Sequence, residues 1–84
     1  MARSSFQKLK PLYIMNYLLQ NSDENHPVTV NQMIDYLGTQ GISAERKSIY
    51  SDIEALRFYG LDIVQSESGR FTGYYVASRN FELP

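Results

Sequence analysis

The 84-residue sequence predicts a small, mainly α-helical domain that ends in a β-hairpin. Apolar residues recur at helical spacing in three successive stretches, and two β-prone runs flank a turn-forming segment near the C-terminus. Apolar residues make up 43% of the composition, which is enough for a core and argues against disorder. A chain this short has room for one compact core. We therefore expect a single domain.

The first helix is predicted from about Lys8 to Gln20, after a polar N-terminal arm at residues 1–7. Its apolar face holds Leu12, Met15, Leu18 and Leu19 and is widened by Ile14. The other side of the helix holds Lys10, Tyr13 and Tyr17. Pro11 is compatible with the first turn, where its missing N–H costs nothing. Residues 21–27 form a loop by composition.

The second helix is predicted to follow a capping box, in which Thr29 and Gln32 satisfy each other's backbone N–H groups. Its apolar positions are Val30, Met33, Ile34 and Leu37. Gly41 followed by apolar Ile42 is typical of a left-handed helix stop.

The central helix is predicted over 43–59, with Ser43 as its N-cap. Ile49, Ile53 and Leu56 fall at i, i+4 and i+7 and make an apolar seam. The opposite side holds Ala44, Lys47, Ser48, Ser51 and Glu54. The helix therefore has one face for the core and another for a partner.

Two β-prone runs, 61–66 and 71–77, surround the turn residues 67–70 and predict a hairpin. Gly73 interrupts the second run, which suggests a bulge. Helix, helix, short turn, helix and hairpin is the order of a winged helix-turn-helix, with the wing at 61–77.

Residues 43–62 read SxxRKSIYSDIEALRxxGLD and resemble the DeoR-type helix-turn-helix. They resemble the N-terminal domain of WYL-domain transcriptional regulators more closely. Gly69, Gly73, Tyr74 and Tyr75 are similar to that family's glycine–tyrosine wing. The resemblance covers about residues 8–78 and implies a bacterial-type regulator that binds specific double-stranded DNA in the cytoplasm.

Three features depart from that family. Ser51 occupies a position where the family often has a basic residue, and the link between the second and third helices is longer than its tight form. Nothing in the chain matches a WYL sensor domain. We therefore expect a truncated fragment, with 79–84 as the start of a linker to a missing C-terminal region that would hold any effector site.

The start of the central helix is the expected reading surface, because the major groove admits an α-helix. Lys47 is a candidate donor to guanine O6 and N7, and Ser48 or Ser51 can pair with donor or acceptor base edges. Ala44 leaves room for close approach. The alternative for Lys47 is an exposed lysine that only interacts with water.

Four further contacts to DNA are expected outside the bases. Arg46 and Tyr50 flank the reading face and can reach phosphates, although Tyr50 packing against the hairpin is an equal alternative. Thr29 lies where a helix N-terminus favours phosphate. Arg70 at the wing tip can touch the backbone or the minor groove, unless it is an exposed turn residue without a role.

The net charge of −1 counts against a simple nucleic-acid binder and predicts weak non-specific affinity. Glu54 is expected outside the groove, and Asp52 is expected to orient a neighbouring cation or backbone group. With near-neutral charge, Ser51 and seven tyrosines, a winged helix used for protein–protein contact is the alternative function. Tyr13, Tyr17 and Tyr36 would then form an apolar patch, or else be half-buried.

Other function classes find little support in the sequence. The chain has no cysteine, which removes disulfides and thiolate ligands and fits a reducing compartment. His26 beside two acids lacks the ligands of a metal site, and no arrangement suggests nucleophilic catalysis or a phosphate loop. We expect no enzyme activity, no cofactor and no membrane partner, because no apolar run approaches the roughly 20 residues of a membrane span. Two-fold homodimers are usual for such DNA readers, but a fragment is monomeric if the missing region makes the dimer.

Overall fold

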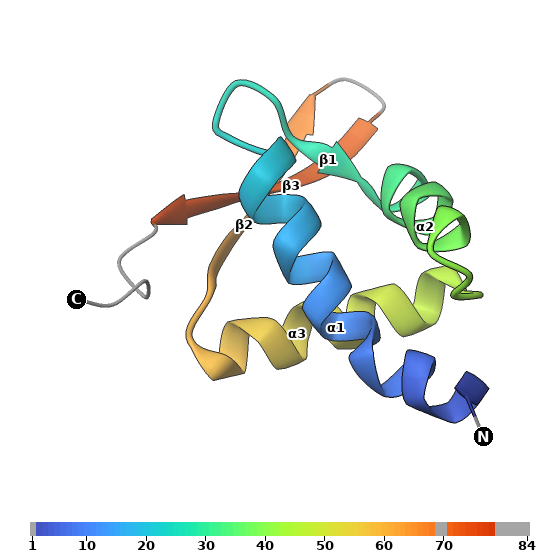
Figure 1. Ribbon diagram of the computed structural model, residues 1–84. Helices are drawn as coiled ribbons and strands as arrows, with labels where there is room; N and C mark the ends of the chain where they lie inside the picture. The colour runs from blue at the N-terminus through green and yellow to red at the C-terminus, as the bar shows by residue number, and fades with distance from the viewer. Residues whose placement is uncertain (1, 69–70, 79–84) are drawn as a thin grey trace.

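The computed structural model describes residues 2–68 and 71–78, and combines three helices with one small sheet (Figure 1). The elements are α1 Ala2–Asn21, β1 Val28–Thr29, α2 Val30–Thr39, α3 Arg46–Tyr59, β2 Asp62–Ser68 and β3 Phe71–Ser78. The sheet is antiparallel, with the strand order β1-β3-β2. The predicted class, mainly helical with a hairpin, is confirmed. Arg70 and the predicted linker 79–84 lie outside the described residues.

Helix α1 begins at Ala2 instead of Lys8 and takes in most of the expected N-terminal arm. No glycine or proline interrupts residues 2–10, so nothing in the local sequence stops the helix. The Gln7 side-chain amide also donates to the Ser43 carbonyl at 3.1 Å, which ties this part of α1 to the chain before α3. Pro11 therefore lies well inside the helix and not in its first turn.

The predicted ends of α2 are confirmed. Thr29 Oγ1 accepts from the Gln32 N–H at 3.2 Å, and Gln32 Oε1 accepts from the Thr29 N–H at 2.8 Å. At the other end Gly41 adopts a left-handed φ of 79°, and the Ile42 N–H reaches the Leu37 carbonyl at 2.9 Å.

Helix α3 begins at Arg46, so the predicted start at Ser43 is wrong. Its N-cap is Glu45, which is extended and makes no side-chain capping bond. The segment before the helix makes tertiary contacts instead. Ile42 is buried in the core, and the Ser43 carbonyl accepts a hydrogen bond from Gln7 of α1. The apolar seam of Ile49, Ile53 and Leu56 is buried as predicted.

The sheet has one strand more than the two-stranded wing that the sequence predicts. The additional strand is β1, which pairs with β3 at Val28↔Tyr74 and Thr29↔Gly73. Two residues are too few to leave a periodic pattern in the sequence. The β2–β3 hairpin itself is confirmed, but its irregular register lies between Asp62 and Ile63, and not at Gly73.

Gly73 has a different role from the predicted bulge. A Cβ built on it would lie 2.6 Å from Pro27 Cβ, which is far inside normal contact. The glycine therefore lets the chain entering β1 pass directly against β3.

The core lies between the three helices and one side of the sheet, and α1 passes across α3 in Figure 1. Its fully buried side chains include Ile14, Leu18, Met33, Leu37, Ile42, Ile49, Ile53 and Leu61. The start of α1 lies near the start of α3, while Ser22, just beyond the end of α1, accepts from the Val76 N–H at 3.3 Å. α3 is thus supported by α1 and α2 and by the sheet, and its outer face stays open.

Candidate functional site

The first two turns of α3 present an exposed face. Lys47 and Ser51, one turn apart, are exposed as the sequence predicts. In the described part of the chain neither side chain has a hydrogen-bond or ion-pair partner. Both are therefore available to a ligand that approaches this face.

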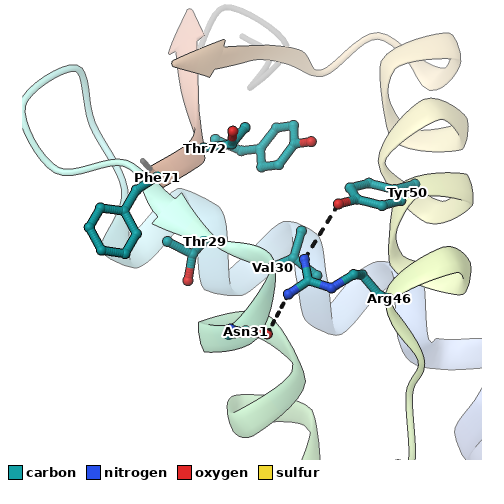
Figure 2. Close-up of a pocket in the computed structure, with 8 residues that line it drawn as sticks. Thr29, Val30, Asn31, Arg46, Tyr50, Phe71 and Thr72 are labelled. Carbon is teal, nitrogen blue, oxygen red and sulfur yellow. Dashed lines mark hydrogen bonds between the residues drawn. The ribbon is translucent and has the colours of Figure 1, made fainter. Parts of the chain in front are cut away.

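Arg46 is held in place on one flank of that face (Figure 2). Its Nη2 donates to Asn31 Oδ1 at 2.8 Å, and its Nη1 donates to the Tyr50 hydroxyl at 3.4 Å. Asn31 belongs to the first turn of α2, so the guanidinium links the starts of two helices. Because both partners are neutral, the positive charge of Arg46 is oriented without being cancelled.

Arg46 and Tyr50 border an open cavity of about 340 Å³ between α3, the start of α2 and β3 (Figure 2). The cavity is lined by Thr29, Val30, Asn31, Arg46, Tyr50, Phe71, Thr72 and Tyr74. A second cavity of about 400 Å³ shares Tyr50, Thr72 and Tyr74 and continues along α3 to Arg57. The two together form a groove between α3 and the sheet.

The polar groups that line the groove include hydroxyls, the guanidinium groups of Arg46 and Arg57, and the carboxylate of Glu54. Burial raises the pKa of the Tyr74 phenol, which strengthens the preference of this group for its neutral form. Arg57 is less available than Arg46, since it donates to Glu54 at 2.6 Å and to the Ile63 carbonyl at 3.0 Å. The cationic end of the groove is therefore the Arg46 end.

Thr29 lies at that same end, at the start of α2. Its hydroxyl is occupied by the capping bond to the Gln32 N–H. An anion at this point would meet the backbone N–H groups of the first helical turn other than the capped N–H of Gln32, and such groups have no partner within a helix.

The other flank of α3 is closed by Lys10, a residue that the sequence prediction placed on the polar side of the first helix. Only 5% of Lys10 is exposed, and its Nζ donates to Ser48 Oγ and to Asp52 Oδ2. Asp52 thus orients a neighbouring cation, as expected. Ser48 is half-buried, with its hydroxyl bound to α1.

A signal for Lys10 was present in the sequence. Lys10 precedes Ile14 and Leu18 at spacings of four, so it continues the stripe of α1 that is most deeply buried. The charge of the side chain hid this position, because lysine is almost never fully buried unless it is paired.

The remaining predicted site residues are separated. Ala44 lies before α3, half-buried and packed against the core, and Arg70 falls outside the described residues. Glu45, which the prediction did not weigh, is an exposed acid directly before Arg46. The structure therefore brings Thr29, Arg46 and Tyr50 together, and places Lys47 and Ser51 beside them.

The far end of α3 has a different character. Phe58 is 95% exposed and Tyr59 is 73% exposed. Phe58 follows Lys47, Ser51 and Glu54 at spacings of three and four, so it continues the same helix face. This face changes along its length from cationic to acidic and then to apolar.

Two further sequence predictions concern regions away from α3. The rings of Tyr17 and Tyr36 are stacked, with centroids 4.5 Å apart, and Tyr13, Tyr17 and Tyr36 are all half-buried. His26 Nδ1 lies 2.9 Å from Asp23 Oδ1, and this hydrogen bond lowers the pKa of the exposed Asp23 carboxyl. Within residues 2–68 and 71–78 no three metal-ligating side chains gather. No helix in the same ranges has the length and apolar character required to cross a bilayer.

The chain matches no family model, no curated protein and no solved structure. The geometry of α3 and its surroundings is therefore what bears on the function of the chain.

Proposed function

We propose that the chain is a winged helix-turn-helix domain that binds double-stranded DNA in a sequence-specific manner. In this proposal it is the N-terminal domain of a cytoplasmic, bacterial-type transcriptional regulator similar to the DeoR-type and WYL-domain proteins. The observation that carries the proposal is the start of α3. From Arg46 to Ser51 its exposed side chains include two cations and no acid, and the carboxylate of the next residue, Asp52, is paired with Lys10.

In the proposed complex the first two turns of α3 enter the major groove. Lys47 donates to guanine O6 and N7, and Ser51 pairs with an adjacent base edge. Ala44 lies just before the helix and leaves space for the duplex. Ser48 is not needed for reading, since its hydroxyl is bound by Lys10.

Phosphates are bound on the sheet-side flank. The oriented guanidinium of Arg46, the Tyr50 hydroxyl and the N–H groups after Thr29 border one cavity, and together they suit a backbone phosphate. The β2–β3 wing follows the flanking backbone or minor groove, with Arg70 as its proposed contact. These contacts position the domain without reading sequence.

The low net charge predicts that the DNA affinity depends only moderately on salt concentration. Few phosphates are neutralised, and each one contributes a slope of about −0.9 to the dependence of log K on log salt concentration. Affinity for a random duplex should accordingly be weak.

The proposal is tested by selecting duplexes from a randomised pool with the 84-residue chain, and then titrating a selected and a scrambled duplex at several salt concentrations. The expected result is a preference for the selected duplex and binding that weakens as salt increases. Failure to bind any duplex even at low salt would overturn the proposal.

Lys47→Ala tests the reading face directly. It should weaken binding to the selected duplex by roughly 1–3 kcal/mol and relax the base preference at one position, because one bidentate contact is lost. Lys8→Ala is the matched control, since Lys8 is also an exposed lysine without a described partner. Equal losses in the two variants would show that Lys47 contributes only charge.

A second candidate is a winged helix used for protein–protein contact. The exposed Phe58 and Tyr59 at the end of α3 favour it. The duplex titration separates the candidates, because a contact module of this kind would show no salt-dependent duplex binding.

The same proposal covers the assembly of the regulator into homodimers and its binding of any effector. Sedimentation of the 84-residue chain with and without a palindromic selected duplex would show whether two copies assemble on DNA or need a further region.

A further inference from the structure

We propose that Lys10 is a positioning residue for DNA reading: it holds Ser48 and Asp52 on the α1 side of α3 and so determines which side chains α3 presents. The inference rests on the proposed function, because it names a residue outside the reading helix that controls its reading surface.

Lys10 and Asp52 are both largely buried. The Lys10 side chain is 6% exposed and the Asp52 side chain is 16% exposed, so both charges have left most of their water. A buried ammonium must be paired and hydrogen-bonded. Lys10 meets this requirement through groups on α3, at Ser48 Oγ and Asp52 Oδ2. The position of α3 relative to α1 is therefore specified by a directional contact as well as by apolar packing.

Two side chains of α1 hold the α3 region. Gln7 and Lys10 lie three residues apart on α1, and both contact the α3 region. Gln7 holds the Ser43 carbonyl before the helix at 3.1 Å, and Lys10 holds two side chains within it. Two attachments at different heights restrict both the rotation of α3 about its axis and its sliding along α1.

The pairing of Lys10 with Asp52 also controls the charge at the edge of the proposed reading surface. Asp52 directly follows Ser51, the last residue of the proposed reading surface. With Lys10 in place, the next exposed acid along α3 is Glu54, beyond that surface. Without Lys10 the Asp52 carboxylate would be an unpaired negative charge at the edge of the surface that meets phosphate, and the Ser48 hydroxyl would be released beside it. Like-charge repulsion would weaken binding to every duplex, and a rotated helix would weaken the discrimination between base pairs.

The experiment compares binding to a duplex selected by the wild-type chain with binding to a scrambled duplex of equal length, at one salt concentration. The ratio of the two affinities is the readout, because a general loss of charge changes both affinities together. The variants are Lys10→Met, Lys10→Arg and the double variant Lys10→Met/Asp52→Leu, with circular dichroism and thermal unfolding to establish which are folded.

The double variant is the decisive one. It removes both charges, keeps the net charge of the wild type and replaces the pair with apolar groups, so it should remain folded. Its affinity ratio should nevertheless fall roughly tenfold, which is the size of one lost base contact. Lys10→Arg keeps a cation at this position and should keep most of the affinity ratio.

Lys8→Met is the matched control, with the same substitution at an exposed lysine of the same helix. It should weaken both duplexes alike and leave the ratio unchanged.

Two results would contradict the inference, and the experiment distinguishes them. A folded double variant with the wild-type ratio would show that Lys10 has only a structural role, and the inference would fail while DNA binding stood. A wild-type chain with no preference for any duplex would overturn the proposed function, and the inference with it.

Discussion

The two polar flanks of α3 meet different neighbours. On the α1 side, Ser48 and Asp52 are bound by the buried Lys10. On the sheet side, Arg46 and Tyr50 face an open cavity, and the guanidinium is held by the neutral groups of Asn31 and Tyr50. A closed flank with paired charges orients a helix, whereas an open flank with an uncancelled charge can bind a ligand. The same helix is thereby divided into a supporting side and a contacting side.

The largest expected effect is on the closed flank. Lys10→Met should lower the free energy of unfolding by about 3–5 kcal/mol, because it leaves the Asp52 carboxylate poorly hydrated and unpaired. Urea denaturation measures this loss. Lys8→Met should change stability by less than about 0.5 kcal/mol, as expected for an exposed site. Similar small changes in both variants would show that the two flanks do not differ as described.

Gly73→Ala tests the close approach of the chain entering β1 to β3, the strand that borders the open flank. The new Cβ would lie 2.6 Å from Pro27 Cβ, so the chain entering β1 must shift. We expect a loss of about 1–3 kcal/mol in the free energy of unfolding, by analogy with overpacked sites.

Gly38→Ala is the matched control for this substitution. A Cβ at Gly38 meets nothing within 4 Å, and alanine should stabilise the helical position by about 0.4–1 kcal/mol. Destabilisation by both substitutions would contradict the close approach at Gly73.

Arg46→Ala should separate stability from binding on the open flank. Stability should change by no more than about 0.5 kcal/mol, because the side chain is exposed. The magnitude of the salt slope for duplex binding should fall by about 1, the contribution of one phosphate contact. An unchanged slope would mean that the cavity beside Arg46 does not hold a phosphate.

A small effect on both binding and stability is expected at Glu45, the acid that precedes α3. Glu45→Gln removes a negative charge beside Arg46 and should raise the affinity for selected and scrambled duplexes alike. It should also lower stability by about 0.3–1 kcal/mol, because a carboxylate at a helix N-terminus interacts favourably with the helix dipole. Weaker duplex binding by this variant would show that the start of α3 does not approach phosphate.

Local chemistry was predicted well where it depends on neighbours in sequence. The capping box of Thr29 and Gln32, the stop at Gly41 and the apolar seam around Ile53 are all confirmed, because each depends on residues within a few positions of one another. The prediction failed where a distant partner decides the outcome. The start of α3 moved to Arg46, since α1 holds the Ser43 carbonyl, and β1 exists only through its pairing with β3.

The candidate site shows the same difference between features set by sequence neighbours and features set by distant partners. Helical spacing alone determined that Lys47 and Ser51 lie one turn apart on the face opposite the seam. Spacing could not distinguish Ser48 from Ser51, because both are small hydroxyl residues on the polar side of one helix. Only the tertiary structure decided that Ser48 is bound to Lys10 while Ser51 faces outward. The physical reason is that a buried lysine needs acceptors, and the packing of α1 against α3 determines which hydroxyl and which carboxylate provide them.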